Sequence, residues 1–259
     1  MRSVRANDGA EIAYETTGAG PMLVLVHGIT ESHRSWDPLI EPLALDYKVV
    51  AVDLRGHGES ARQAPYDAFT MAADVHAVVE AVGPTDPLLV GHSLGGAVVS
   101  LYAATYPARG VVNVDQVLML GAFRELLLSM EPALRGDEAT FQATIAAMFS
   151  ALDGALSDAE RARIASHACP EQDVVMGVWD LVLTTDADEL DALLAQTAKG
   201  VTVPYLALHG REPGDDYRIW LTDAVPSSEI ELWNSDSHYP HLVEPDRFLE
   251  RLHEFGHRL

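Results

Sequence analysis

Hydrophobic residues along this chain follow two spacings, one typical of strands and one typical of helices. Short, nearly continuous apolar runs are typical of parallel strands buried on both faces, and they occur at residues 22–26, 48–52, 88–90, 116–120 and 204–208. Two further segments, residues 9–17 and 229–233, alternate polar and apolar positions as half-exposed strands do. The pattern therefore predicts a sheet of mostly parallel strands.

Helical spacing fills the segments between these strands. Apolar positions recur three and four residues apart, as on one face of a helix, at residues 36–45, 69–82 and 96–106. Strands that alternate with helices predict a doubly wound α/β fold with right-handed crossovers. The whole chain then forms one α/β core, unless a segment breaks the alternation.

One long segment does break it. Residues 124–200 contain no strand pattern and instead carry amphipathic helical stretches, at residues 137–151, 158–168, 172–183 and 187–198. We therefore expect a core built from residues 1–123 and 201–259, with residues 124–200 inserted as a helical cap over the site.

Composition narrows the classes of partner. The 17 basic and 39 acidic side chains give a net charge of −22, which argues against binding to nucleic acid or to an anionic membrane. A single cysteine, Cys169, excludes an intrachain disulfide and a cysteine-based metal cluster. The polar N-terminus lacks a signal-like apolar core, and no apolar run reaches membrane-spanning length. A soluble cytoplasmic protein is expected, and its oligomeric state is not encoded in these patterns.

The candidate chemistry is concentrated in the pentapeptide Gly91-His92-Ser93-Leu94-Gly95, between the run 88–90 and the helix 96–106. In a Gly-x-Ser-x-Gly turn between strand and helix, the backbone is strained at the serine and its Oγ is exposed to a bound acyl group. The two glycines leave room where side chains would collide with the packed helix and strand. Ser93 is therefore a candidate nucleophile.

The loops that follow the strands are the next place to search, because ligands of doubly wound sheets bind beyond the carboxyl ends of the strands. After residues 22–26 comes His27-Gly28-Ile29-Thr30, where a backbone N–H paired with that of Leu94 would form an oxyanion hole. After residues 48–52 come Asp53 and His57, which we expect to brace the core rather than to form a catalytic pair.

Two later loops supply a candidate acid and a candidate base. The loop after residues 204–208 offers the carboxylates of Glu212, Asp215 and Asp216, one of which would accept Nδ1–H from a catalytic histidine. The last strand leads to His238 and, three residues later, His241. The order serine, acid, histidine is that of the α/β-hydrolase arrangement.

With these residues in place, the chain resembles the α/β-hydrolase fold superfamily over nearly its whole length, and in particular its serine esterase-like members. The resemblance is carried by Val26-His27-Gly28, Asp53-Leu54-Arg55-Gly56-His57-Gly58-Glu59-Ser60, Gly91-His92-Ser93-Leu94-Gly95-Gly96 and Ser237-His238-Tyr239-Pro240-His241-Leu242 before Glu244-Pro245. It implies Ser93 as nucleophile, His238 as general base and then acid, and the backbone amides of Ile29 and Leu94 as oxyanion donors. It also implies a catalytic triad under a helical cap, with neither a metal nor an organic cofactor.

The acid departs from the pattern of the family. Members commonly carry His-Gly-x-x-Asp, whereas here Pro213 stands at the position of the aspartate. A loop shorter by one residue would place Glu212 there, and we take Glu212 as the expected acid, with Asp215 and then Asp216 as alternatives. The segment that follows residues 116–120, Gly121-Ala122-Phe123, offers no carboxylate. The alternative acid position of some relatives is therefore expected to be empty.

These residues predict a serine hydrolase that cleaves a small, largely apolar ester or related acyl compound through an acyl-enzyme on Ser93. A carbon–carbon bond hydrolase or a cofactor-free perhydrolase on the same scaffold is the enzymatic alternative, and a non-catalytic ligand-binding protein is another. The serine at the turn disfavours haloalkane dehalogenases and epoxide hydrolases, whose nucleophile is an aspartate. The candidate pocket walls are Phe123, Met148, Phe149, Trp179 and Trp220.

Overall fold

The computed structural model describes all 259 residues and contains one eight-stranded sheet of order β1-β2-β4-β3-β5-β6-β7-β8. The strands β3 to β8 pair in parallel, and β1 and β2 join one edge antiparallel. The predicted doubly wound, mostly parallel sheet is confirmed. The strand bounds are β1 Arg2–Arg5, β2 Glu11–Thr17, β3 Met22–Val26, β4 Lys48–Val52, β5 Leu88–His92, β6 Gly110–Val114, β7 Tyr205–His209 and β8 Ser228–Leu232.

Helices cover both faces of this sheet. One face packs against α1 (Asp37–Leu43) and α11 (Pro245–His257), and the other packs mainly against α2 (Ala68–Val82) and α3 (Leu94–Thr105). Alternate residues of each central strand enter the two cores, because successive side chains of a strand point to opposite faces. Every residue of β3, β5, β6 and β7 is buried, which explains their apolar runs. Two further helices, α9 (Asp215–Ala224) and α10 (Pro240–Val243), precede and follow the last strand in the sequence.

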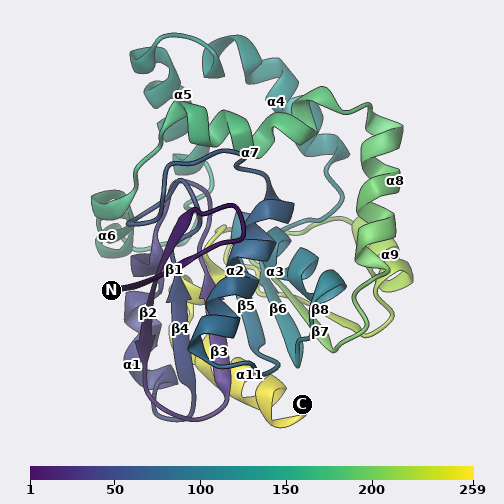
Figure 1. Cartoon of the computed structure of the whole chain (residues 1–259). Coiled ribbons are helices and arrows are strands. Elements are labelled where there is room, and N and C mark those ends of the chain that lie inside the picture. Colours follow the sequence, from purple (N-terminus) through teal and green to yellow (C-terminus); the bar gives the residue numbers. More distant parts are fainter.

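A layer of helices lies between β6 and β7 in the sequence and above the sheet in Figure 1. Its members are α4 (Gly121–Leu134), α5 (Glu138–Ser150), α6 (Asp158–His167), α7 (Gln172–Thr184) and α8 (Ala187–Ala198). The first of them, α4, has no counterpart among the predicted helices. Ser157 caps α6 by accepting the Glu160 N–H at 3.2 Å. None of the helices combines the length and the hydrophobicity that a membrane-spanning segment requires.

The strand predicted at residues 116–120 is wrong. The strand in this part of the chain is β6, Gly110–Val114, and the apolar residues that follow it line a cavity instead. An apolar run satisfies either environment, so its hydrophobicity alone does not distinguish a buried strand from a cavity wall. The edge strand β1 was also not predicted, since its mostly exposed residues carry little hydrophobic pattern.

Candidate active site

Ser93 occupies the sharp turn between β5 and α3. Its backbone has φ 51° and ψ −123°, a conformation that strains any residue with a side chain. The glycines on either side are required by space, because a Cβ at Gly91 would collide with the Gly95 carbonyl and a Cβ at Gly95 with the Val26 carbonyl. The Ser93 N–H donates to the Val114 carbonyl at 3.0 Å, which ties the turn to β6. The strained serine turn is therefore built into the packing of the sheet.

The two expected oxyanion donors lie beside this serine. Leu94 is the first residue of α3, and the N–H groups of a helix's first turn have no partner within the helix. The N–H of Ile29 has no hydrogen-bond acceptor in the protein, and both residues line the same cavity as Ser93. A Cβ at Gly28 would lie only 3.3 Å from the Ser93 Cβ, so the loop that carries Ile29 passes directly against the serine.

His238 is paired with Asp115, a residue that the sequence did not single out. The His238 Nδ1 lies 2.6 Å from the Asp115 Oδ2, and the two side chains are 13% and 8% exposed. The other carboxylate oxygen of Asp115 accepts the Gly210 N–H at 2.8 Å. The His238 backbone is held as well, because its N–H donates to Leu152 and its carbonyl accepts Nε2–H of His92, both at 2.8 Å. The imidazole is thus fixed in position and in tautomer.

Asp115 carries its negative charge in a nearly closed environment. Burial by itself would raise the pKa of this carboxyl, but the side chains of His209 and His238 outweigh that effect and hold the pKa of Asp115 well below its ordinary value. An ionised carboxylate at this position favours Nδ1–H on His238, which leaves Nε2 free to accept a proton.

The expectation that Glu212 contacts the histidine is wrong. Its side chain is 55% exposed and accepts two hydrogen bonds from Arg218, each at 3.0 Å. These bonds lower the pKa of Glu212 and hold its carboxylate in an ion pair at the rim of the cavity. The two alternatives, Asp215 and Asp216, are exposed in the first turn of α9. The expectation of an empty acid position beyond β6 is equally wrong, since Asp115 occupies it.

Asn113 explains why Asp115 lies where it does. Its buried side chain accepts the Gln116 N–H at 3.1 Å and donates to the Gln116 carbonyl at 2.8 Å, closing the turn that follows β6. Asp115 inside this turn has φ 56°, a conformation that Asp and Asn tolerate better than most residues. The signal in the sequence was an apolar run, Gly110–Val114, followed directly by an acid, but the neighbouring run 116–120 obscured it.

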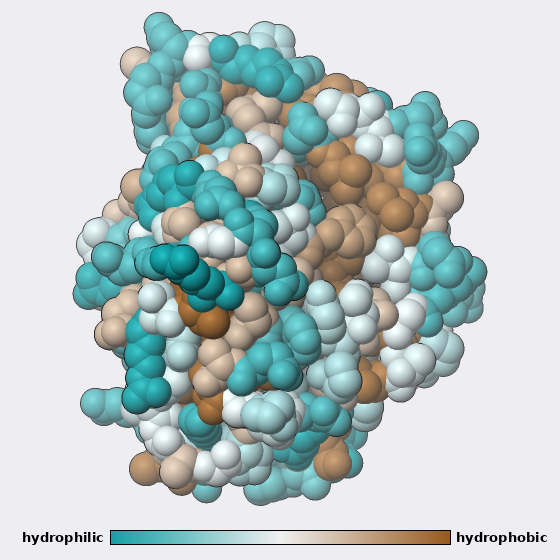
Figure 2. Space-filling view, in the orientation of Figure 1, coloured by the Kyte–Doolittle hydropathy of each residue, from teal (hydrophilic) through white to brown (hydrophobic).

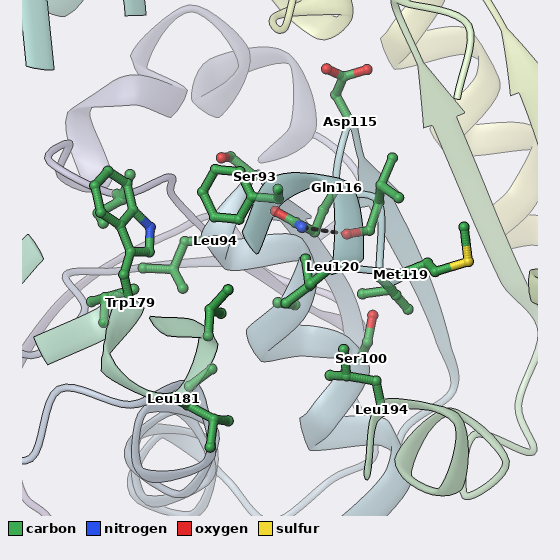
Figure 3. Close-up of a pocket in the computed structure, with 18 of the residues that line it drawn as sticks. Ser93, Leu94, Ser100, Asp115, Gln116, Met119, Leu120, Trp179, Leu181 and Leu194 are labelled. Carbon is green, nitrogen blue, oxygen red and sulfur yellow. Dashed lines mark hydrogen bonds between the residues drawn. The ribbon is translucent and has the colours of Figure 1, made fainter. Parts of the chain in front are cut away.

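A cavity of about 490 Å³ opens beside these residues, and its lining is mostly hydrophobic. Ser93, Ile29, Leu94 and His238 all contribute to it. In Figure 3 the labelled side chains converge on the cavity from the Ser93 turn and α3, from the segment after β6, and from α7 and α8. Figure 2 shows hydrophobic surface gathered in a hollow beneath α7 and beside α8. The cavity is therefore an apolar chamber that has the polar side chains of Ser93 and His238 in its lining.

Most of the expected pocket walls are present. Phe123, Met148, Phe149 and Trp179 line the cavity. Trp220 does not line the cavity. Its ring instead stacks on that of Tyr217, with 6.0 Å between the two ring centroids. Sequence position alone does not separate these cases, because an aromatic residue in an amphipathic helix serves a core or a cavity equally well.

Similarity to known proteins agrees with this geometry. Residues 21–201 match the family model described as the alpha/beta hydrolase fold. The chain belongs to the α/β hydrolase fold family. The structure of a putative aryl esterase from Burkholderia cenocepacia matches with a TM-score of 0.81 and 26% identity, over 99% of this chain and 98% of that one.

Two curated relatives of this α/β hydrolase fold protein differ in how much of their length they share with it. The pimeloyl-[acyl-carrier protein] methyl ester esterase of Klebsiella pneumoniae (strain 342) is 29% identical over 93% of this chain and 96% of its own length. A non-heme haloperoxidase of Rhodococcus erythropolis is 38% identical over 51% of this chain. The chain spans 47% of the length of that haloperoxidase.

Behind the cavity, this α/β hydrolase fold protein has a buried polar cluster around Glu31. The Glu31 carboxylate accepts hydrogen bonds from Ser35 at 2.7 Å and from Tyr239 at 3.0 Å. His241, the second candidate base, lies in the same region with its ring 4.9 Å from that of Trp36 and does not line the cavity. Of the two candidate bases, only His238 borders the cavity that Ser93 lines.

Proposed function

We propose that the protein is a serine hydrolase that cleaves a largely apolar ester through an acyl-enzyme on Ser93. The observation that carries the proposal is the contact between His238 and Asp115 at 2.6 Å, at the cavity that Ser93 also lines. A nucleophile, a base and a buried acid that orients the base are the requirements of this mechanism.

Each step follows from the position of these groups. His238 Nε2 takes the proton of the Ser93 hydroxyl as Oγ attacks the ester carbonyl, and Asp115 stabilises the imidazolium that forms. The N–H groups of Ile29 and Leu94 donate to the oxyanion of the tetrahedral species. His238 then protonates the departing alcohol, and the same residue activates water to release the acid from Ser93.

Relatives and cavity support an ester as the substrate. The relative that matches 93% of the chain is a methyl ester esterase, and a solved structure with a TM-score of 0.81 is a putative aryl esterase. Of the 30 residues that line the cavity, 21 are hydrophobic, so the acyl part of the substrate is expected to be apolar.

A second reaction is favoured by one relative. The partial match to a non-heme haloperoxidase, at 38% identity, keeps cofactor-free perhydrolysis as an alternative, in which hydrogen peroxide replaces water as the acceptor of the acyl group. The same acyl-enzyme on Ser93 would serve both reactions. Peracid formation from an ester and hydrogen peroxide measures this activity directly.

Labelling with a fluorophosphonate probe tests the proposal, because only an activated serine reacts with it. We expect wild-type protein to be labelled, and Ser93→Ala to lose both labelling and at least ~10⁴-fold in turnover of p-nitrophenyl esters. Ser129→Ala, on the exposed side of α4 and outside the cavity, is the matched control and should behave as wild type. Full turnover by Ser93→Ala would contradict the proposed function, and an unlabelled wild type would favour a non-catalytic binding protein.

A further inference from the structure

We infer that the cavity is a channel for an extended acyl chain of about eight to ten carbon atoms, which lies along α3 from Ser93 to the end of the cavity at α8. The inference rests on the proposed function for its orientation, since the ester carbonyl is placed at Ser93. It adds the substrate class, namely esters of unbranched medium-chain acids.

The face of α3 sets the length of the channel. The residues of α3 and its preceding turn that line the cavity include Ser93, Leu94, Ala97, Ser100 and Leu101. They lie on one face of the helix because the steps from Ser93 and Leu94 to Ala97, and from Ala97 to Ser100 and Leu101, are three or four residues. Eight residues at 1.5 Å each span about 12 Å from Ser93 to Leu101. An extended chain advances roughly 3.5 Å over three bonds, so about ten bonds fit this length.

The hydroxyls at the far end of the channel have no free proton to donate to a ligand. The Ser100 hydroxyl is already bound to the Gly96 carbonyl at 2.7 Å and to the Tyr205 hydroxyl at 2.9 Å. The Thr197 hydroxyl donates to the Leu193 carbonyl at 2.8 Å. Because each hydroxyl already donates its proton within the protein, neither can donate to a ligand there, and a hydrocarbon chain suits this end.

Helices α7 and α8 form the wall of the cavity at this end. Leu194 and Ala198 from α8 and Leu181 and Val182 from α7 line the cavity beside α3. In Figure 3, Ser93 and Asp115 lie at one end of the view, and Ser100 and Leu194 at the other. The acyl chain of the substrate therefore extends away from Asp115 and His238 and reaches α8.

The opposite end suits the leaving group. His238, which protonates the alcohol in the proposed reaction, borders the cavity together with Leu152, Glu212 and Pro213. Glu212 is exposed and ion-paired with Arg218 at this rim, so the alcohol side meets a polar, solvated edge. We therefore expect the apolar acyl chain to lie towards α8 and the alcohol to lie at the rim beside Glu212.

A series of p-nitrophenyl esters from acetate to hexadecanoate tests the length. Each additional buried methylene is worth about fourfold, so we expect kcat/KM to rise at least ~30-fold from acetate to a maximum at octanoate or decanoate and to fall beyond dodecanoate. A maximum at acetate, or at an aryl acid such as benzoate, would overturn the inference while the proposed function stands.

Two variants locate the chain. Ala97→Phe fills the channel one turn from Ser93, and Leu194→Trp shortens the channel from the far end. Each variant should lower the ratio of kcat/KM for the decanoyl ester to kcat/KM for the acetyl ester at least ~30-fold. Ala97→Phe should also move the maximum of kcat/KM to the shorter acyl chain. Ala192→Phe, on the exposed face of α8 and outside the cavity, is the matched control with the wild-type ratio. Fluorophosphonate labelling of each variant verifies that its site has folded, and a variant that is labelled yet keeps the wild-type profile would contradict the channel.

A binding measurement separates this inference from the proposed function. Decanoate should raise the melting temperature of Ser93→Ala by more than acetate does, and Leu194→Trp in the same background should abolish the difference. If no ester is cleaved but decanoate binds, the channel stands and the hydrolase proposal fails; if esters are cleaved but decanoate gives no greater shift than acetate, the channel fails alone.

Discussion

Asp115 occupies the left-handed region, with φ 56°, and its carboxylate joins three parts of the chain: the turn after β6, the Gly210 N–H and the His238 ring. The apolar run before Asp115 is only a weak signal, and the sequence does not pair the two residues because the partner histidine is 123 residues away. Glu212, which fits the expected loop position better, is instead held by a local ion pair with Arg218.

Asp115→Asn tests this assignment with little change in shape, since asparagine also tolerates the left-handed conformation. The amide would either donate its N–H to His238 Nδ1 or accept a weaker hydrogen bond from Nδ1–H. The tautomer that carries the proton on Nδ1 would lose its advantage, so kcat should fall about 10³–10⁴-fold. Turnover of a preferred ester measures the effect. Asp215→Asn, at an exposed and rejected candidate position, should behave as wild type, and Glu212→Gln should cost far less than Asp115→Asn. A larger loss in Glu212→Gln would contradict the assignment.

The loop after β4 braces neighbouring elements, as expected from its sequence. Asp53 accepts hydrogen bonds from the His33 and Glu59 backbone N–H groups at 2.7 and 2.9 Å. Arg55, only 1% exposed, binds Asp74 of α2 through Nε and through a second nitrogen, at 2.6 and 2.7 Å. A planar guanidinium that makes two parallel bonds to a carboxylate holds both elements in a defined orientation.

Removing one partner of this buried pair should be costly to stability. Asp74→Ala leaves the buried Arg55 guanidinium without its main counter-charge, and we expect the free energy of unfolding to fall by about 3–5 kcal/mol. Asp8, which is 38% exposed and contacts the same arginine at 2.8 Å, provides the comparison, with a loss of about 1 kcal/mol for Asp8→Ala. Denaturant unfolding at constant m-value measures both, and equal losses would contradict the argument.

Buried histidines make the stability of the whole molecule depend on pH. Burial lowers the pKa of His57 to about 3 and lowers the pKa of His241 well below its ordinary value. The unfolded chain takes up protons at these side chains near pH 6.5, whereas the folded protein does not. The stability that these neutral histidines contribute to the folded protein is therefore present above about pH 6.5 and is lost as the pH falls towards 3. His33 acts in the opposite sense, because its contact with Asp53 outweighs burial and raises its pKa.

We expect the free energy of unfolding to decrease from pH 7.5 to pH 5, with His57 contributing up to about 1.4 kcal/mol per pH unit. Denaturant midpoints at pH 7.5, 6.0 and 5.0 measure the slope. His57→Gln removes one titrating group, so its slope should be smaller than that of the wild type by that amount. Identical slopes in the two proteins would show that His57 does not carry this dependence.

The sequence by itself determined the parts of this protein that depend on local physics. The glycines around Ser93 indicate a tight strand-to-helix turn, continuous apolar runs indicate buried or cavity-lining positions, and apolar spacings of three and four residues indicate helices. The serine turn, most strands of the sheet and most helices between β6 and β7 were therefore predictable. The tertiary structure alone decided which acid meets His238 and which apolar run forms β6. Parallel pairing of β6 with β7, with Val114 opposite Leu208, brings Asp115 next to the Gly210 backbone. That register depends on packing across the whole sheet, which no local window of the sequence contains.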